Sequence, residues 1–467
     1  MLSARGLIVA GTASGVGKTS ITLGLLAALA TSVRISAAKV GPDYIDPHLH
    51  AAATHRASYN IDPVLTGPLG VRASLARAAR ETDLVVVEGV MGLFDGTDLP
   101  DLPADTQPSA SSPAGSTAQV ARLTGLPVIL VIDCAHLSQS TAAIALGYQK
   151  LNPEVKIVGV ILNNLKSATH EALIRQAMAA IDVEILGAIP SGGLPERDSR
   201  HLGLLTAEEA PWQARQWIQA LGASIRTHVE LTQIITRAGR IDPHPLVAAV
   251  RMPPELVTRP VIAYSNGPAA SFIYPENLDL LTEAGAEVIG FDPRHESIPP
   301  QAGLIWLHGG YPENYRAEIS ANAPLHQALR QAARSGLPII AECGGHLLLG
   351  VSLEESAMSG VLPFQSTIGT RPRLGYRQVL LPAQSPLSLI DRHELPAHEF
   401  HYARSSEDGN ALLLRTARES WRAGFARPSM ISSYLHWHLG ADSRLPASLV
   451  QIAARQRLSQ LAQEPQR

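Results

Sequence analysis

The sequence predicts an α/β protein built from two doubly wound domains. Apolar segments alternate with helical stretches through the first half of the chain, and the same alternation begins again after a proline-rich segment. The length of 467 residues also exceeds what one compact core supports. The apolar segments lack a polar–apolar alternation, as is typical of parallel strands covered by helices on both faces.

The first domain is expected to span residues 1–240. A strand at 6–11 leads into the glycine-rich stretch GTASGVGKTS, and a helix begins at Lys18. Further strands are expected at 34–41, 83–90, 126–133, 156–164 and 184–190. Residues 99–116 are rich in Pro, Ser and Asp without periodicity, which predicts a long loop.

A proline-rich linker is predicted at 241–258, and the second domain is expected to span residues 259–467. Apolar runs predict strands at 259–266, 286–293, 302–310, 337–345, 398–404 and 429–438, with helices between the first four. Two chain segments with this pattern each predict an open sheet whose ligands bind at the carboxyl ends of the strands.

Composition excludes several classes of protein. A net charge of −3 gives no basic field for nucleic acid, and no apolar run is long enough for a membrane span. The N-terminal residues lack the features of a secretory signal, so a cytoplasmic location is expected. The two cysteines, Cys134 and Cys343, are therefore not expected to form a disulfide, and no Cys/His cluster has zinc spacing.

Residues 11–20 resemble a phosphate-binding loop with one departure. Gly17, Lys18 and Thr19 match the end of the motif G-x-x-x-x-G-K-[ST], but the first glycine stands at 11 instead of 12. Backbone N–H groups around Gly15 and Gly17 are predicted to surround phosphate at a helix N-terminus. Lys18 would reach the β- and γ-phosphates, and Thr19 would ligate Mg²⁺. The alternative is a glycine-rich turn with an exposed lysine.

Further polar residues follow other strands of the first domain. The stretch KVGPDYIDPHLH brings Lys39, Asp43, Tyr44 and Asp46 to the end of the second strand, where substrate and an acyl phosphate would bind. Glu88 ends another strand and would hold Mg²⁺ directly or through water. The alternative is that these are ordinary turn residues.

The second domain contains the pattern of a nucleophilic thiol. In IIAECGGHLLLG, Cys343 lies between a strand and a helix, a geometry expected to expose the thiol and lower its pKa. Gly309 and Gly310, after the preceding strand, are candidates for an oxyanion hole. The distant stretch SYLHWH supplies His436 and His438 as candidate bases, whereas Cys134 is expected to be a packing residue.

Several motifs carry a resemblance to known families. The form G-T-x-x-x-x-G-K-T resembles the dethiobiotin synthetase branch of phosphate-loop proteins. The stretches GPDYIDPHLH, EGVMGLFDG, PENLDLLTEAGAE, HGGYPENY and AECGGHLLLG are similar to the cobyrinate and hydrogenobyrinate a,c-diamide synthase family. This resemblance implies an N-terminal P-loop NTPase domain that uses ATP and Mg²⁺, and a C-terminal, flavodoxin-like class I glutamine amidotransferase domain. The family amidates the a and c carboxylates of a cobalamin precursor with glutamine as nitrogen donor.

The resemblance also assigns roles. His436 aligns with the catalytic histidine of class I glutamine amidotransferases, and His438 stands where their H-x-E glutamate would be. It therefore implies a Cys343–His436 dyad, with no group assigned to orient His436. The expected partners are a tetrapyrrole polycarboxylate, glutamine and ATP, without nucleic acid or membrane, and a homodimer is the protein assembly considered.

Three alternative functions share parts of this pattern. The same chemistry could act on sirohydrochlorin, siroheme or a nickel derivative, and the motifs do not separate these substrates. A nucleotide-switch partitioning protein with an inactive amidotransferase tail is disfavoured by Cys343 and His436. The cytidine triphosphate synthase arrangement carries the H-x-E that is absent here.

Overall fold

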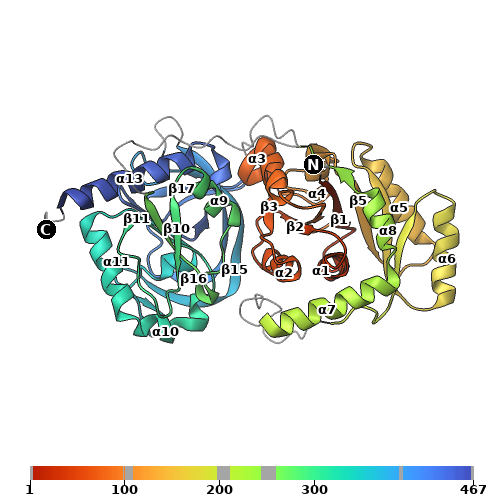
Figure 1. The fold of residues 1–467 in the computed structure, drawn as a ribbon, viewed down its shortest axis with the longest axis horizontal. Helices are drawn as coiled ribbons and strands as arrows, with labels where there is room; N and C mark the ends of the chain where they lie inside the picture. The colour runs from red at the N-terminus through yellow and green to blue at the C-terminus, as the bar shows by residue number, and fades with distance from the viewer. Residues whose placement is uncertain are drawn as a thin grey trace. The chain divides into compact units, whose positions relative to one another are not determined.

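The described residues of a computed structural model are 4–97, 99, 109–196, 211–242, 259–388 and 393–463. They form two compact units, one before and one after the segment predicted to be a linker (Figure 1). That linker, 241–258, lies outside the described residues apart from 241 and 242, so the domain limits at 240 and 259 stay predictions. Residues 100–108, half of the loop predicted at 99–116, also lie outside them.

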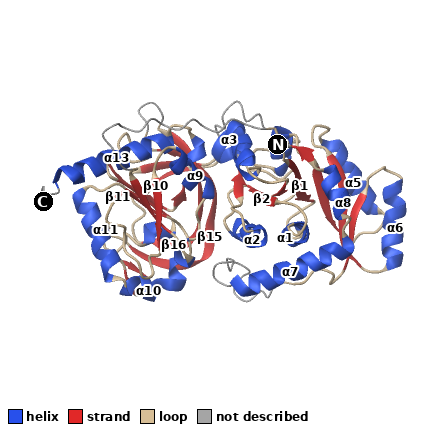
Figure 2. Cartoon of the chain, in the orientation of Figure 1, coloured by secondary structure: helices blue, strands red, loops and turns tan. Residues whose placement is uncertain are grey.

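The first unit is built on a parallel sheet with the strand order β3-β2-β4-β1-β5-β6-β7. Figure 2 shows the strands of this unit in red, with helices around them. A short strand, β8, pairs antiparallel with β1. The strands are β1 (Arg5–Gly11), β2 (Ile35–Val40), β3 (Tyr59–Ile61), β4 (Leu84–Glu88), β5 (Val128–Asp133), β6 (Ile157–Leu165), β7 (Ile185–Pro190) and β8 (Gly239–Arg240).

Helices cover both faces of this sheet, as predicted. Along β1, Leu7 and Val9 pack with α1, α2 and α7, whereas Ile8 and Ala10 pack with α3 to α6 on the other face. The helices are α1 (Lys18–Leu29), α2 (Ile45–Thr54), α3 (Pro63–Ala78), α4 (Thr117–Thr124), α5 (Ser140–Leu151), α6 (Ala168–Ala179), α7 (Pro211–His228) and α8 (Leu231–Arg237). Because successive side chains from Leu7 to Ala10 point to opposite faces of the sheet and are all apolar, two layers of helices are needed to bury them.

The second unit contains a sheet with the order β10-β9-β11-β12-β20-β19, parallel as far as β20. Helices α9 and α13 pack on one face and α11 on the other. The strands are β9 (Val261–Ser265), β10 (Glu287–Phe291), β11 (Ala302–Leu307), β12 (Ile339–Glu342), β19 (Phe425–Arg427) and β20 (Met430–Ser433). The helices are η2 (Pro268–Ala270), α9 (Pro275–Glu283), η3 (Pro312–Tyr315), α10 (Arg316–Ala321), α11 (Ala323–Ser335), α12 (Gly344–Leu347), η4 (Leu439–Ala441) and α13 (Leu445–Gln463).

A second, mostly antiparallel sheet was not predicted. Its longest strand, β15 (Gln365–Leu380), contains glycine and proline and a register shift after Ile368, so it does not read as a strand. The other strands are β13 (Ser352–Leu353), β14 (Ser356–Ala357), β16 (Glu394–Ser405), β17 (Leu412–Arg415), β18 (Ser420–Ala423) and β21 (Leu435–His436). The single strand predicted at 429–438 is thus two strands, β20 and β21, in different sheets. Throughout the part of the chain that the structure describes, no helix is both long and apolar enough to cross a membrane.

Candidate active site

The loop between β1 and α1 has the conformation of an anion-binding loop. Gly15 and Gly17 have φ angles of +79° and +97°, which residues with a Cβ rarely adopt. No side chain caps the N-terminus of α1, which leaves its first N–H groups for a ligand. The Lys18 ammonium donates to the Ala13 carbonyl at 3.0 Å and so folds back over the loop.

The displaced first glycine has a steric reason. A Cβ on Gly11 would lie 2.6 Å from Val16 Cγ2 and 2.9 Å from Lys18 Cδ. The neighbouring Thr12 is anchored by its backbone, because its N–H donates to the Val131 carbonyl and its own carbonyl accepts from the Tyr148 hydroxyl. In this loop the lysine stem therefore needs a glycine at position 11.

Beside the loop, carboxyl ends of β2 and β4 bring buried charges together. The Lys39 ammonium lies 2.6 Å from Asp46 Oδ2 and 3.0 Å from Glu88 Oε1. The Thr19 hydroxyl donates to the same Glu88 oxygen at 2.6 Å. These groups therefore lie together at one edge of the sheet, as the sequence predicts.

The shared lysine sets the ionisation of this cluster. Burial would lower the pKa of Lys39, but Asp46 and Glu88 outweigh it and raise that pKa. Burial would raise the pKa of Glu88, but Lys39 and His50 hold it well below its usual range. Burial and the Asp43 and Glu88 carboxylates raise the pKa of Asp46, and burial and Lys39 lower the pKa of Lys18.

The remaining residues of the predicted substrate loop have different environments. Asp43 Oδ1 accepts from the backbone N–H of Ile45 at 2.7 Å, at the start of α2, and Tyr44 is buried. His50 was not predicted, although its Nε2 lies 2.8 Å from Glu88 Oε2 and its Nδ1 lies 3.0 Å from Ser58 Oγ. Its position one helical turn after Asp46 was the available signal.

In the second unit, Cys343 occupies a sharp turn between β12 and α12. Its φ and ψ are 46° and −108°, a strained conformation for a residue with a Cβ. Its N–H donates to the Ser433 carbonyl at 2.8 Å, and its thiol donates to the Phe400 carbonyl at 3.2 Å. Strain held by such contacts is frequent at catalytic nucleophiles.

The glycines around Cys343 let backbone N–H groups and the His436 imidazole come close to the thiol. Backbone N–H groups of Gly344 and Gly310 hydrogen-bond the sulfur and favour the thiolate. A Cβ on Gly309 would lie 2.3 Å from His436 Cε1 and 3.1 Å from Cys343 Cβ, so this glycine makes room for the imidazole beside the thiol. The Gly310 N–H is therefore placed as a candidate oxyanion donor, whereas Gly309 is needed because it has no side chain. The Gly344 N–H is a further candidate donor that was not predicted from sequence.

The expectation of an exposed thiol with a lowered pKa is wrong for this conformation. Cys343 is buried, and burial together with the Glu313 carboxylate raises the pKa of its thiol despite the two N–H donors. Helix α12 has only four residues, so its N-terminus contributes little. Burial and the neighbouring His398, His308 and His401 lower the pKa of His436. Both shifts favour the neutral thiol and the neutral imidazole.

The other candidate residues lie apart from this pair. His438 Nδ1 accepts from the Gly440 N–H at 3.1 Å, and its Nε2 lies 3.6 Å from Glu276 Oε2. Cys134 is fully buried in the apolar core of the first unit, where burial raises the pKa of its thiol to about 11. Those surroundings are typical of a packing cysteine.

Two family models match the chain. Residues 7–204 match the CobQ/CobB/MinD/ParA nucleotide binding domain, and residues 261–444 match the CobB/CobQ-like glutamine amidotransferase domain. Hydrogenobyrinate a,c-diamide synthase from Mycobacterium tuberculosis is 37% identical over 96% of this chain and 97% of its own length. The Streptomyces coelicolor enzyme of that name is 36% identical, over 93% and 95% of the two chains. Cobyrinate a,c-diamide synthase from Syntrophotalea carbinolica is 35% identical, over 94% and 96%.

The chain belongs to the a,c-diamide synthase family. Membership bears out the resemblance drawn from the motifs, together with the prediction of an N-terminal nucleotide-binding domain and a C-terminal glutamine amidotransferase domain. The assignment of single site residues in this a,c-diamide synthase stays a prediction.

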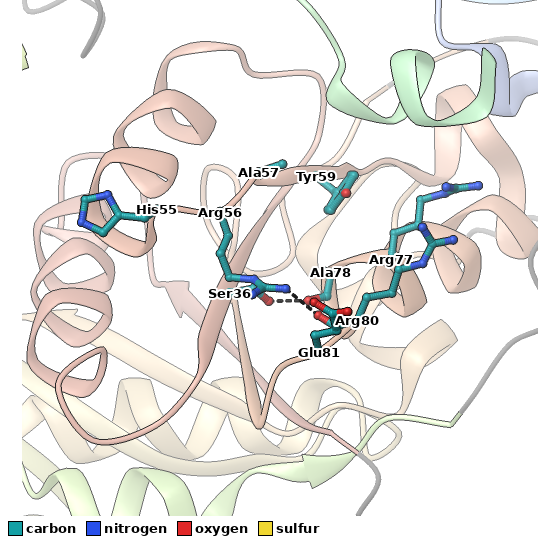
Figure 3. Close-up of a pocket in the computed structure, with 9 residues that line it drawn as sticks. All are labelled: Ser36, His55, Arg56, Ala57, Tyr59, Arg77, Ala78, Arg80 and Glu81. Carbon is teal, nitrogen blue, oxygen red and sulfur yellow. Dashed lines mark hydrogen bonds between the residues drawn. The ribbon is translucent and has the colours of Figure 1, made fainter. Parts of the chain in front are cut away.

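The first unit also contains a basic pocket, away from its phosphate loop. It has a volume of about 440 Å³ and is lined by residues that include Ser36, His55, Arg56 and Arg80 (Figure 3). Ser36 belongs to the amino end of β2, the sheet edge opposite the phosphate loop. Ser36 and Arg56 donate to the carbonyls of Ala78 and Arg80 at the end of α3, so these polar groups serve to terminate that helix.

Gly17→Ala tests the phosphate loop of this a,c-diamide synthase. A Cβ at Gly17 would lie 2.5 Å from Asn163 Nδ2, the group that donates to the Val16 carbonyl at 3.0 Å. Because the backbone strain alone costs about 1–3 kcal/mol, we expect ATP affinity to fall about tenfold or more in a calorimetric titration. Gly147→Ala, on the exposed side of α5 with open space around it, is the matched control. Equal affinities for the two variants would contradict the loop assignment.

Proposed function

We propose that this protein uses ATP and glutamine to convert the a and c carboxylates of cobyrinate or hydrogenobyrinate to amides in cobalamin biosynthesis. Membership of the a,c-diamide synthase family supports the proposal. The observation that carries it is that a single chain holds a phosphate loop beside buried Lys39 and Glu88, and a strained Cys343 beside His436.

The first half of the proposed reaction activates a carboxylate. A carboxylate is a poor electrophile, so ATP would first convert it to an acyl phosphate, which ammonia then attacks. Lys18 and Lys39 are the cations that would stabilise the charge that develops on the transferred phosphoryl group. The pKa of Lys18 is lowered and that of Lys39 is raised, so Lys39 is the lysine that would keep its proton more firmly.

The residues beside the loop suit Mg²⁺. Thr19 Oγ1 and Glu88 Oε1 are oxygen ligands 2.6 Å apart, and an ionised Glu88 is favoured by Lys39 and His50. Mg²⁺ bound there would neutralise charge on the nucleotide phosphates. Lys39 and His50 would then hold the Glu88 carboxylate in place.

The second half of the proposed reaction releases ammonia from glutamine. Cys343 would attack the side-chain amide carbon while His436 takes the thiol proton. The C–N bond then breaks, the imidazolium returns a proton to the leaving ammonia, and water hydrolyses the thioester. The Gly310 and Gly344 N–H groups would stabilise the oxyanion.

The experiment that tests the substrate is mass spectrometry of tetrapyrroles incubated with the protein, ATP, Mg²⁺ and glutamine. Cobyrinate, hydrogenobyrinate and sirohydrochlorin are offered separately. We expect two amidations on a corrin. Amidation of sirohydrochlorin alone would overturn the proposed substrate, and ATP hydrolysis without any amide product would favour a nucleotide switch. A cytoplasmic location and a homodimer stay predictions.

A further inference from the structure

We infer that Glu342, the residue immediately before the nucleophile, orients His436 and takes the place of the carboxylate that the sequence H-x-H lacks. The inference rests on the proposed glutaminase function and assigns a positioning residue to it. It answers which group holds the base of the Cys343–His436 pair.

Glu342 lies at the centre of the elements that form this site. It is the last residue of β12 and is 2% exposed. Its Oε1 accepts from the backbone N–H of Trp437 at 3.0 Å, next to His436 in β21. Its Oε2 lies 3.2 Å from His308 Nδ1, at the end of β11 beside the oxyanion glycines. The carboxylate of Glu342, at the end of β12, therefore contacts both the segment that carries His436 and the segment that leads to Gly309 and Gly310.

The same Oε2 atom lies 4.0 Å from His436 Nδ1. This distance is longer than a hydrogen bond, and such contacts in ligand-free sites often shorten when substrate binds. With Nδ1 directed at Glu342, the other ring nitrogen, Nε2, would take the thiol proton. This is the arrangement in which a carboxylate selects the tautomer of a catalytic histidine and stabilises the imidazolium.

Charge explains why a carboxylate is needed. When the S–H bond of Cys343 breaks, the proton moves to His436, and a buried imidazolium forms beside other imidazoles. The titratable groups around His436 are His308 after β11, His398 and His401 on β16, Glu342 at the end of β12 and Cys343 in the turn that follows it. Three of these are histidines whose positive charge lowers the pKa of His436, whereas an ionised Glu342 would stabilise the imidazolium.

His438 is not placed to orient His436. Its Nδ1 accepts the Gly440 N–H, and its Nε2 faces Glu276, another buried carboxylate. Glu276 and His438 thus form a second glutamate–histidine pair in the same unit. That pair provides a matched control for a change at Glu342.

Glu342→Gln is the test, with Glu276→Gln as its control. Both variants replace a buried carboxyl group by an amide of nearly the same shape. We expect Glu342→Gln to lower kcat for glutamine hydrolysis at neutral pH by about 10- to 100-fold, with little change in KM, and Glu276→Gln to leave kcat near the wild-type value. Amidation with added ammonia should persist in both variants, which reports on folding.

The pH profile separates orientation from packing. In Glu342→Gln, alkylation of Cys343 by iodoacetamide should be slowest relative to wild type near neutral pH. The deficit should shrink as pH rises, because hydroxide then removes the thiol proton without His436. A deficit that is the same at every pH would indicate packing alone and overturn the inference.

The wild-type protein provides an independent measurement. Nitrogen NMR of ¹⁵N-histidine-labelled protein, assigned with His436→Gln, should show the proton of His436 on Nδ1. A proton on Nε2 would overturn the inference even if Glu342→Gln does not fold. Equal glutaminase rates in the two glutamine variants would also overturn it while leaving the proposed function intact. A wild-type protein that does not hydrolyse glutamine would refute the proposed function itself.

Discussion

Cys343→Ser is expected to lower glutamine-dependent amidation by at least about 10⁴-fold, while amidation with a high concentration of ammonium salt continues. The thiol is the group that would carry the γ-glutamyl intermediate, and a serine hydroxyl in its place is a much weaker nucleophile. Ammonia supplied from solution needs only the activated carboxylate. The measurement is the initial rate of amide formation with each nitrogen donor.

The matched control is Cys134→Ser, which places the same substitution in the core of the first unit. There Cys134 Sγ lies 3.6 Å from the Ile132 carbonyl, a contact that a serine hydroxyl can replace. This variant should use both nitrogen donors at nearly the wild-type rate. Loss of ammonia-dependent amidation in Cys343→Ser would contradict the separation of the two half-reactions.

Lys18→Ala is expected to abolish amidation with either nitrogen donor, by at least about 100-fold. Lys18 lies over the loop between β1 and α1 and is 8% exposed, so its ammonium is held where the nucleotide phosphates would bind. Without it the charge that develops during phosphoryl transfer loses a partner. The measurement is ADP release together with amide formation.

Lys156→Ala is the control for Lys18→Ala, because Lys156 is an exposed lysine of the same unit. Glutamine hydrolysis should survive in both variants, since Cys343 and His436 are unchanged. Amidation at the wild-type rate in Lys18→Ala would exclude this loop as the site of ATP use.

The parallel strands could be predicted from sequence because their residues are apolar on both faces. β1 and β5 each begin and end within two residues of the expected limits. Strand β15 could not be predicted from sequence, because its glycines, its proline and its register shift hide the strand pattern. The apolar run at 429–438 also gives no sign that its two halves join different sheets, because that depends on pairing with distant strands.

Site residues could be predicted from sequence where they directly follow or end a recognisable strand. Lys39 and Glu88 each lie at the carboxyl end of a parallel strand, so their meeting follows from topology. His50 and Glu342 were missed because their significance depends on partners far away in the sequence. The raised pKa of Cys343 was missed because burial depends on the second sheet, whose Phe400 covers the thiol.

The most direct test of the proposed function is to follow the side-chain nitrogen of glutamine into the product. The wild-type protein is incubated with ATP, Mg²⁺, a corrin dicarboxylate and glutamine labelled with ¹⁵N in its amide, and the product is weighed by mass spectrometry. We expect a diamide that carries two ¹⁵N atoms, with one ADP formed for each amide. A product that gains no ¹⁵N, or amide formation without ADP, would contradict it.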